Sequence, residues 1–339
     1  MFCFFESRIT LYASRLTIYT ISYFEGYQLQ DTTQRFNLIV ICGPTASGKT
    51  RLGVELARHV SGEIISVDSR QVYRGMDIGT GKDFAEYVTP DGRVPHHLID
   101  IADPEQVYTL WNYQRDFYRV FDEIMGRRTL PVAVGGSGLY LEAVLKNYRI
   151  PTVPEDVELR RSLALYSKAE LDDRLKKLNP ALYDQTDTSS KKRLVRAMEI
   201  ALYAVEHEVQ WGVDSPPVLK PFVIGVRWPR PVLQQRIKQR LTERLDQGMP
   251  AEARCLLEAG VTPERLEMFG LEYKYLNRFL QKRMSYDEMV TGLYRDICRF
   301  AKRQETYFRG MQRRGLSINW VENADVEQAV ELVDQQLRG

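Results

Sequence analysis

The sequence of 339 residues has few cysteines, no long apolar run and almost no net charge. Its four cysteines are Cys3, Cys42, Cys255 and Cys298, and no C-x-x-C pair occurs among them. This pattern argues against a zinc knuckle and a disulfide framework and fits a reducing cytoplasm. No apolar stretch is long enough to span a bilayer, so no membrane contact is expected. The 47 basic and 45 acidic residues nearly cancel, which argues against indiscriminate nucleic-acid binding by the whole molecule.

Residues 1–36 do not resemble the start of a globular domain. The stretch from Leu16 to Phe24 is rich in Thr, Ser and Tyr and lacks a small-residue cleavage site, so it makes a poor secretory signal. Few acids occur in the segment, which leaves an organelle transit peptide open as an alternative. We predict a disordered leader or a start codon assigned too early, and we leave the segment out of the fold.

The strongest local signal is the segment Gly43–Thr50, which matches the pattern G-x-x-x-x-G-K-[ST] in full. It directly follows the apolar run Leu38–Cys42 and precedes a helical apolar stripe at 52–60. A strand, a glycine turn and a helix in this order predict a phosphate-binding loop (P-loop). Backbone N–H groups and the helix N-terminus face the anion, Lys49 adds a charge, and the Thr50 hydroxyl can reach Mg²⁺. We therefore expect the chain to bind a diphosphate or a triphosphate.

From residue 37 onward, strand-like and helix-like segments alternate, which is typical of a parallel sheet with helices on both faces. Strands are predicted at 38–42, 63–67, 97–101, 130–134 and 221–226, and helices at 52–60 and 111–127. Residues 151–216 are charged, helical in pattern and without a strand signal. The predicted fold class is therefore α/β: a P-loop parallel-sheet core over 37–150 and 217–339, an inserted all-helical domain at 151–216, and a helical C-terminal part.

The ends of two predicted strands carry candidate functional residues. Asp68 follows the second strand, and the carboxyl ends of strands face the ligand crevice in open α/β sheets. A general base is favoured over a helix cap or a structural acid. The turn Gly135–Tyr140 lies where a nucleotide hydrolase would more often carry a Walker-B Asp. Its small residues suggest close backbone approach by a bulky ligand.

Two further features are interpreted as structural. The segment Gly79–Asp83 looks like a second phosphate loop, but Met76 and Asp83 stand where the pattern needs Gly and Ser or Thr. His96 and His97 are adjacent, so they point to opposite faces of a strand and cannot share one metal.

Basic residues gather in three helical clusters, at 191–196, 236–244 and 299–309. In the second cluster, Arg236, Arg240 and Arg244 recur every four residues and form a stripe beside an apolar one. Taken singly, each cluster is typical of a solvated helix face.

In their order along the chain, these motifs resemble the tRNA dimethylallyltransferases, isopentenyltransferases that modify the adenine next to the anticodon. The resemblance runs from about Asn37 to Arg309 and rests on Gly43–Thr50, Val67–Thr80, His96–Asp100, Gly135–Tyr140, Lys192–Glu199 and Ala301–Gln304. It implies transfer of a dimethylallyl group from dimethylallyl diphosphate to the N6 amine of adenine 37, in tRNAs that read codons starting with U. It also implies Mg²⁺ as cofactor, the anticodon stem-loop of tRNA as partner, and a monomeric cytoplasmic enzyme. The C-terminal zinc finger of eukaryotic members has no counterpart here, which favours the bacterial type.

The resemblance assigns roles where residues match the family. Asp68 would accept the proton of the adenine amine, Ser137 would keep a hydroxyl near the reacting centre where the family usually has Thr, and Lys49 would assist catalysis. The diphosphate would be bound by Gly43, Thr45, Ala46, Ser47, Gly48, Lys49, Thr50 and Arg240, with Thr50 also reaching the metal. tRNA would be bound by Asp68, Ser69, Arg70, Gln71, Ser137, Arg160, Lys192, Arg193, Arg196, Lys302, Arg303, Gln304 and Arg309.

Three departures from the family pattern stand out. Gly81-Lys82-Asp83 replaces Ala-Lys-Pro, Tyr307 replaces Trp, and Phe269–Tyr273 replaces a loop like Ile-Gly-Tyr-Lys-Glu. The last departure touches a region expected to contact tRNA, so it leaves the RNA substrate open.

Three alternative functions remain. A small-molecule kinase using ATP is disfavoured by the missing Walker-B Asp and the lack of a lid arginine pair. An adenylate isopentenyltransferase is disfavoured by the large basic helical insertion. An inactive RNA-binding relative is disfavoured by the presence of Lys49, Thr50 and Asp68.

Overall fold

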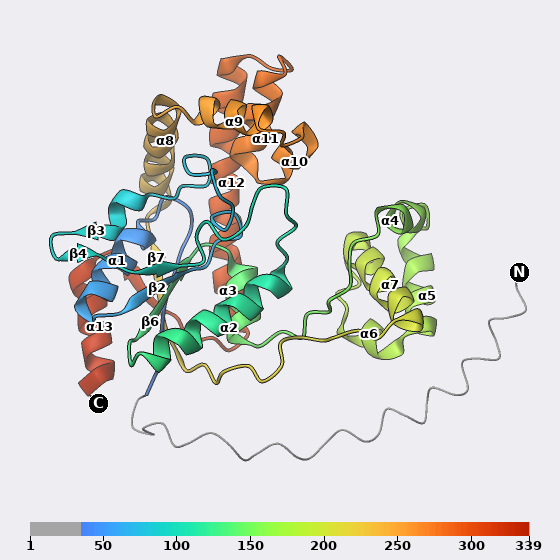
Figure 1. Ribbon diagram of the computed structural model, residues 1–339, viewed down its shortest axis with the longest axis horizontal. Helices are drawn as coiled ribbons and strands as arrows, with labels where there is room; N and C mark the ends of the chain where they lie inside the picture. Colours follow the sequence, from blue (N-terminus) through green and yellow to red (C-terminus); the bar gives the residue numbers. More distant parts are fainter. Residues whose placement is uncertain (1–34, 339) are drawn as a thin grey trace, which may run out of the picture. The chain divides into compact units, whose positions relative to one another are not determined.

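The computed structural model describes residues 35–338, so residues 1–34 of the predicted leader lie outside the described part (Figure 1). Its centre is a six-stranded sheet in which every neighbouring pair of strands is parallel. In spatial order the strands are β5 (His96–His97), β2 (Glu63–Ser66), β6 (Pro131–Gly135), β1 (Leu38–Cys42), β7 (Pro221–Arg227) and β8 (Asn319–Glu322). A small antiparallel hairpin, β3 (Val88–Thr89) with β4 (Gly92–Arg93), lies outside this sheet.

The central strand β1 is buried on both faces. Leu38, Val40 and Cys42 contact one hydrophobic layer, whereas Ile39 and Ile41 contact the other. Side chains of a strand alternate between its two faces, so an unbroken apolar run is what a doubly covered parallel strand requires. The sequence-based prediction of this strand and of a parallel α/β core is confirmed.

Helices cover both faces of the sheet. On one face, α2 (Leu110–Gly126), α3 (Gly138–Leu145) and α12 (Tyr286–Arg313) contribute to the same hydrophobic layer. On the other face, α1 (Lys49–His59) and α13 (Val326–Arg338) pack together against the sheet.

The predicted strand at 97–101 is wrong beyond its first residue. β5 ends at His97, and Leu98 and Asp100 have left-handed backbone angles, with φ of 61° and 56°. The Asp100 carboxylate contacts the ammonium group of Lys82, a residue that is only 5% exposed. The strand therefore ends where the backbone becomes left-handed, next to this ion pair. The strand β8 was not predicted from the sequence, whereas α13 falls within the predicted helical C-terminal part.

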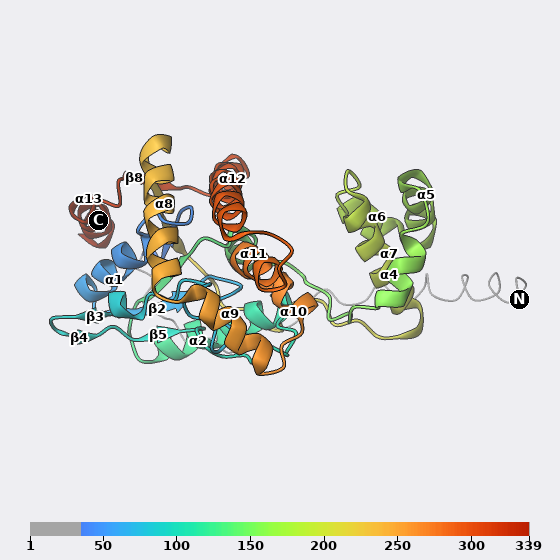
Figure 2. The same ribbon diagram turned by 90° about the horizontal axis from the view of Figure 1, so that it is seen from above.

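The C-terminal half supplies a second, helical layer. After β7 come α8 (Arg230–Asp246), α9 (Met249–Glu258), α10 (Pro263–Met268) and α11 (Leu271–Leu280), which pack with α12 (Figures 1 and 2). Their shared core contains Leu241 of α8, Leu276 of α11 and Leu293 of α12, together with Val72 and Met76 from the loop after β2. This layer ties that loop to the helices.

Residues 151–216 form four helices and contribute no strand to the sheet. The helices are α4 (Val157–Leu163), α5 (Lys168–Leu178), α6 (Pro180–Gln185) and α7 (Lys191–Glu206), with a core of their own around Leu171, Leu175 and Leu194. The predicted helical character is confirmed, and the domain boundaries stay a prediction.

Within residues 35–338, no helix combines the length and the apolar character needed to cross a membrane.

Replacing Phe308 of α12 by alanine tests the contact between this helix and the sheet. Phe308 is fully buried in the layer beneath the sheet, so Phe308→Ala should lower the free energy of unfolding by about 3–5 kcal/mol. Urea unfolding measures the loss, and Arg313→Ala at an exposed position of the same helix is the control, expected within about 0.5 kcal/mol of wild type. A loss below about 1 kcal/mol in Phe308→Ala would contradict this packing.

Candidate active site

The loop between β1 and α1 forms an anion cradle. Ala46 and Gly48 have left-handed backbone angles, with φ of 59° and 81°, and Gly48 caps α1 without a side-chain hydrogen bond. The first backbone N–H groups of a helix have no partner within the helix, and the helix dipole places partial positive charge there. The turn therefore presents donors and positive potential at one point, as phosphate binding requires.

Lys49 adds the cation of this cradle. Among residues 35–338, its Nζ donates a hydrogen bond only to the backbone carbonyl of Pro44, at 3.3 Å. Burial, followed by the nearby Arg240, lowers the pKa of Lys49 to about 8, although Asp68 and Glu86 act in the opposite direction. An anion brought to this ammonium group would stabilise its charged form.

Gln304 of α12 holds the cradle in place. Its Oε1 accepts a hydrogen bond from the backbone N–H of Thr45 at 2.9 Å, and its Nε2 donates to the carbonyl of Gly136 at 2.9 Å. The side chain is 9% exposed and joins the P-loop, the turn after β6 and α12. The sequence predicted a contact with tRNA for this residue; that contact stays a prediction, and the structure shows a positioning role.

Asp68 and its neighbours lie at the end of β2. The Asp68 carboxylate accepts the backbone N–H of Arg70 at 2.9 Å, and the backbone N–H of Ser69 donates to the Ser137 hydroxyl at 3.3 Å. Gln71 accepts from the hydroxyl of Ser66 and donates to the carbonyl of Gly81, both at 2.9 Å. These bonds fix the loop after β2 against the turn after β6.

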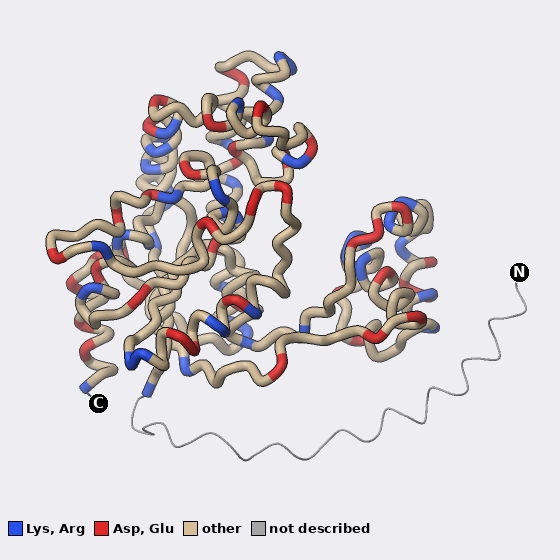
Figure 3. Tube along the Cα trace, in the orientation of Figure 1, with Lys and Arg blue, Asp and Glu red and all other residues tan. Residues whose placement is uncertain are grey.

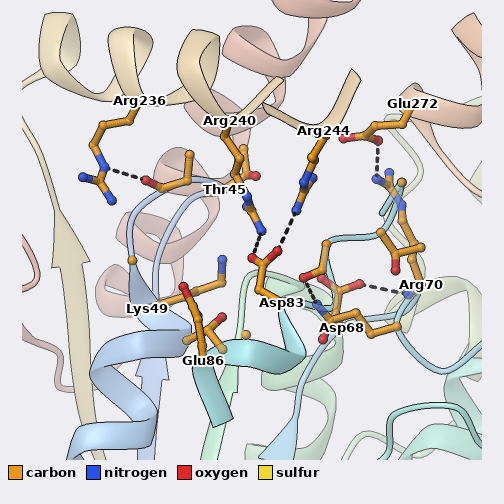
Figure 4. A pocket seen from close by; sticks show the side chains of 18 of the residues that line it. Thr45, Lys49, Asp68, Arg70, Asp83, Glu86, Arg236, Arg240, Arg244 and Glu272 are labelled. Atoms are coloured by element: carbon orange, nitrogen blue, oxygen red, sulfur yellow. Dashed lines mark hydrogen bonds and ion pairs between the residues drawn. The ribbon is translucent and has the colours of Figure 1, made fainter. Parts of the chain in front are cut away.

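One pocket of about 340 Å³ unites most of the residues predicted for catalysis and diphosphate binding, together with part of the predicted tRNA contacts (Figure 4). The predicted residues that line it are Thr45, Ala46, Gly48, Lys49, Thr50, Asp68, Arg70, Gln71, Arg240 and Gln304. Ser137 and Ser47 are among the predicted residues outside this lining. The Ser137 hydroxyl accepts a hydrogen bond from the backbone N–H of Ser69, and Ser47 is fully buried within the P-loop.

All three arginines of the basic stripe on α8 line this pocket, although the family resemblance assigned a ligand role to Arg240 alone. Lys and Arg recur along α8 in Figure 3. Arg236 donates to the Ala46 carbonyl at 2.9 Å, and Arg240 contacts Asp83 at 2.5 Å. Arg244 is 9% exposed, and its Nη2 lies 3.9 Å from the other Asp83 oxygen. The four-residue spacing was the signal for a shared face.

Besides Asp68, the pocket contains acids that sequence reasoning missed, namely Asp83, Glu86, Glu243 and Glu272. Burial, followed by the neighbouring Asp83, raises the pKa of Glu86. The segment Gly79–Asp83 was set aside because it does not match a phosphate loop, yet it forms one wall. Asp83 directly precedes a short 3₁₀ turn (Phe84–Tyr87) and Glu86 lies within it, so no periodic pattern marked these two acids.

Glu272 belongs to the departing loop Phe269–Tyr273. Its Oε2 lies 3.4 Å from Nη1 of Arg70, whose guanidinium also lies 5.4 Å from the ring centre of Phe300. The departure from the family pattern therefore contacts Arg70, a residue predicted to bind tRNA.

The glycines at and after the end of β6 lie close to other parts of the chain. A Cβ at Gly135 would lie 2.0 Å from the carbonyl oxygen of Val67, and a Cβ at Gly138 would lie 2.4 Å from the Tyr307 ring. Packing within the chain therefore favours glycine here. Gly135 also lines the pocket, and the close approach of a bulky ligand stays a prediction.

The remaining predicted tRNA contacts lie on helices outside the pocket lining. Arg160 of α4 and Arg196 of α7 both contact the buried carboxylate of Glu199, with Arg160 Nη2 at 2.8 Å. Their charges thus already stabilise the helical segment. Lys192 and Arg193 of α7 and Lys302, Arg303 and Arg309 of α12 are exposed. A contact with RNA stays a prediction for all seven.

The pocket offers hard oxygen donors of the kind Mg²⁺ prefers. Thr50 lines it at the first turn of α1, and Asp68 lines it from the neighbouring strand end. Residues 35–338 contain no cluster of three or more His, Cys, Asp or Glu side chains suited to a metal. Mg²⁺ commonly keeps several waters and takes further oxygens from phosphates. A sparse protein donor set therefore fits a metal that arrives with a diphosphate.

The fold and the site define a P-loop α/β protein whose anion cradle lies beside a carboxylate at the adjacent strand ends. Comparison with known families makes this specific. A family model described as IPP transferase matches residues 71–311, and one described as Isopentenyl transferase matches residues 36–97. The chain belongs to the IPP transferase family, which confirms the resemblance seen in its motifs.

Individual relatives agree. The chain is 50% identical over 305 residues to a tRNA dimethylallyltransferase of Syntrophus aciditrophicus, which covers 89% of this chain and 99% of that protein. The crystal structure of a tRNA isopentenylpyrophosphate transferase from Bacillus halodurans matches with a TM-score of 0.64 and 32% identity, covering 89% of this chain and 97% of that one. A eukaryotic dimethylallyltransferase acting on tRNA matches with a TM-score of 0.64 and 21% identity, covering 86% of this chain and 75% of that one, and shares the fold.

The lowered pKa of Lys49 predicts a pH-dependent affinity for inorganic pyrophosphate. The charged ammonium group is the binding form, and with a pKa of about 8 it is lost as the pH rises through that value. Affinity should therefore fall more steeply between about pH 7 and 9 in wild type than in Lys49→Arg, whose guanidinium stays charged. Calorimetric titrations measure the affinity of both proteins across this pH range. Because the ionisation of pyrophosphate itself affects both proteins equally, it drops out of the comparison between them. Parallel pH profiles would show that Lys49 does not titrate in this range.

Proposed function

We propose that the protein transfers a dimethylallyl group from dimethylallyl diphosphate to the N6 amine of adenine 37 in tRNA and releases diphosphate. Membership of the IPP transferase family supports tRNA prenylation as the activity. The finer assignment is supported by one observation above all: Asp68 lines the same pocket as Lys49 and Thr50. A base thus stands beside an anion cradle, and the adjacent strand β6 ends in Gly135 without an acid.

In this proposal the P-loop binds the leaving group. The C–O bond between the allylic carbon and the diphosphate breaks, and negative charge builds on the departing oxygen. Backbone N–H groups at the start of α1, together with Lys49 and Arg240, stabilise this charge because they are already oriented toward it. Mg²⁺ held by the Thr50 hydroxyl and phosphate oxygens would neutralise further charge on the diphosphate.

Asp68 would supply the general base. The lone pair of the adenine amine is delocalised into the ring, so the amine is a poor nucleophile until it is oriented and loses a proton. The backbone N–H of Arg70 already binds one oxygen of this carboxylate and fixes its direction. The proton of the amine moves to Asp68 as the new N–C bond forms.

The acceptor has to enter this pocket as an extruded base, since a stacked adenine cannot present its amine to a carboxylate. Arg70 and Gln71 line the pocket next to Asp68 and offer donors to such a base. The exposed basic residues of α7 and α12, among them Lys192 and Lys302, would bind the RNA backbone.

Nucleoside analysis tests the proposal directly. Purified protein is incubated with dimethylallyl diphosphate, Mg²⁺ and unmodified tRNA. We expect N6-dimethylallyl adenosine at position 37 and an equal amount of pyrophosphate. Product from adenosine monophosphate but not from tRNA would favour the adenylate-type enzyme. Phosphate transfer from ATP without any prenylation would favour a kinase.

A substitution at Asp68 tests the mechanism. Asp68→Asn keeps the size of the side chain and removes its basicity, so turnover should fall by about 10²–10⁴-fold while the affinity for the prenyl diphosphate changes little. Asp122→Asn, an exposed acid on α2, is the matched control and should keep wild-type turnover. Single-turnover kinetics and donor titration measure the two quantities. Normal turnover in Asp68→Asn would remove this residue from the mechanism.

A further inference from the structure

Asp83 is an acid in the pocket that the proposed reaction does not use. Its Oδ2 lies 2.5 Å from Nη2 of Arg240, and its Oδ1 lies 3.9 Å from Nη2 of Arg244 (Figure 4). The side chain is 39% exposed, so a ligand in the pocket can reach this ion pair. The Arg240 guanidinium is also expected to bind the diphosphate. It would therefore have two anionic partners, the Asp83 carboxylate and the diphosphate.

The backbone fixes Asp83 beneath the two guanidinium groups. Gly81 has φ of +72°, and a Cβ there would lie 1.8 Å from Nη2 of Arg244 and 2.7 Å from Nη2 of Arg240. Glycine adopts this backbone angle without strain and leaves space for the two guanidinium groups above the turn. Next to it, Lys82 is buried, and its ammonium group donates to the Tyr73 carbonyl at 2.6 Å.

The same turn is clamped from α9. The carboxylate of Glu252 accepts the backbone N–H groups of Asp77, Ile78 and Gly79 at 2.8, 2.7 and 2.9 Å. Held on both sides, the turn cannot carry Asp83 away from Arg240 when a second anion arrives. The carboxylate and the anion must then share, or compete for, the same guanidinium.

The surrounding charges set the direction of the effect. Arg70 contacts Glu272, and Arg236 donates to the Ala46 carbonyl, so these two cations have partners of their own. Arg240 and Arg244 share the carboxylate of Asp83, and within residues 35–338 Nη2 of Arg244 has no hydrogen-bond partner. Without the Asp83 charge, these two neighbouring cations would lose the carboxylate that lies between them, while Glu86 and Glu272 remain in the pocket lining. An incoming anion would then be held more tightly.

We propose that Asp83 competes with the diphosphate for Arg240, which weakens the hold on the pyrophosphate product and speeds its release. This inference rests on the proposed function. As the product leaves, the guanidinium returns to the Asp83 ion pair seen in the structure. No covalent bond changes in this step. Asp83 is thus a positioning residue that acts through Arg240.

Titration with inorganic pyrophosphate and Mg²⁺ tests the competition. Asp83→Asn and Asp83→Ser, which remove the charge with two different side chains, should both bind pyrophosphate about tenfold more tightly than wild type. Asp83→Glu, which keeps a carboxylate, should stay nearer to wild type than either. Asp91→Asn removes an exposed acid from the same stretch of chain, outside the pocket, and should not change the affinity.

Kinetics separate release from chemistry. With tRNA and donor, Asp83→Asn should show product inhibition at about tenfold lower pyrophosphate and a lower steady-state kcat, while its single-turnover rate stays within about twofold of wild type. Unchanged or weaker pyrophosphate binding in both neutral variants would overturn the inference and leave the proposed function standing. If the wild-type protein failed to bind pyrophosphate at all, the proposed function and this inference would fall together.

Discussion

All six strands of the central sheet run in one direction, so their carboxyl ends lie along one edge, and the pocket is built there. β1 ends in the P-loop, β2 ends just before Asp68, and β6 ends at Gly135. Gln304 then joins the first and third of these ends through its two amide hydrogen bonds. Without the shared strand direction, the cradle and the carboxylate would lie at opposite ends of the sheet.

The second wall of the pocket is an arrangement of charges. α8 contributes three arginines from one helical face, and the turn Gly79–Asp83 contributes one carboxylate that contacts two of them. In the proposed function the anion bound by this pocket is a product that has to be released. Cations alone would bind it strongly and release it slowly, and the carboxylate beside Arg240 would moderate that attraction.

Much of this was predictable from the sequence, because it rests on local patterns. The P-loop, β1, α1 and Asp68 depend on a motif and on periodicities within a short stretch. Asp83, Arg244 and Glu272 escaped prediction because their partners lie far away in the chain, as in the contact between Asp83 and Arg240. The predicted strand around β5 was too long, since the left-handed backbone angles of Leu98 and Asp100 are not visible in the apolar pattern.

The sequence by itself determined that an anion cradle follows an apolar strand, that a parallel α/β core surrounds it, and, through its ordered motifs, to which family the chain belongs. The tertiary structure alone decided which charges meet in the pocket and why the glycines after β6 are needed, namely for contact with Val67 and Tyr307. The physical reason is the distance along the chain over which each kind of interaction acts. Backbone geometry and helix periodicity act over a few residues, whereas ion pairs and close packing act between whichever residues the fold brings together.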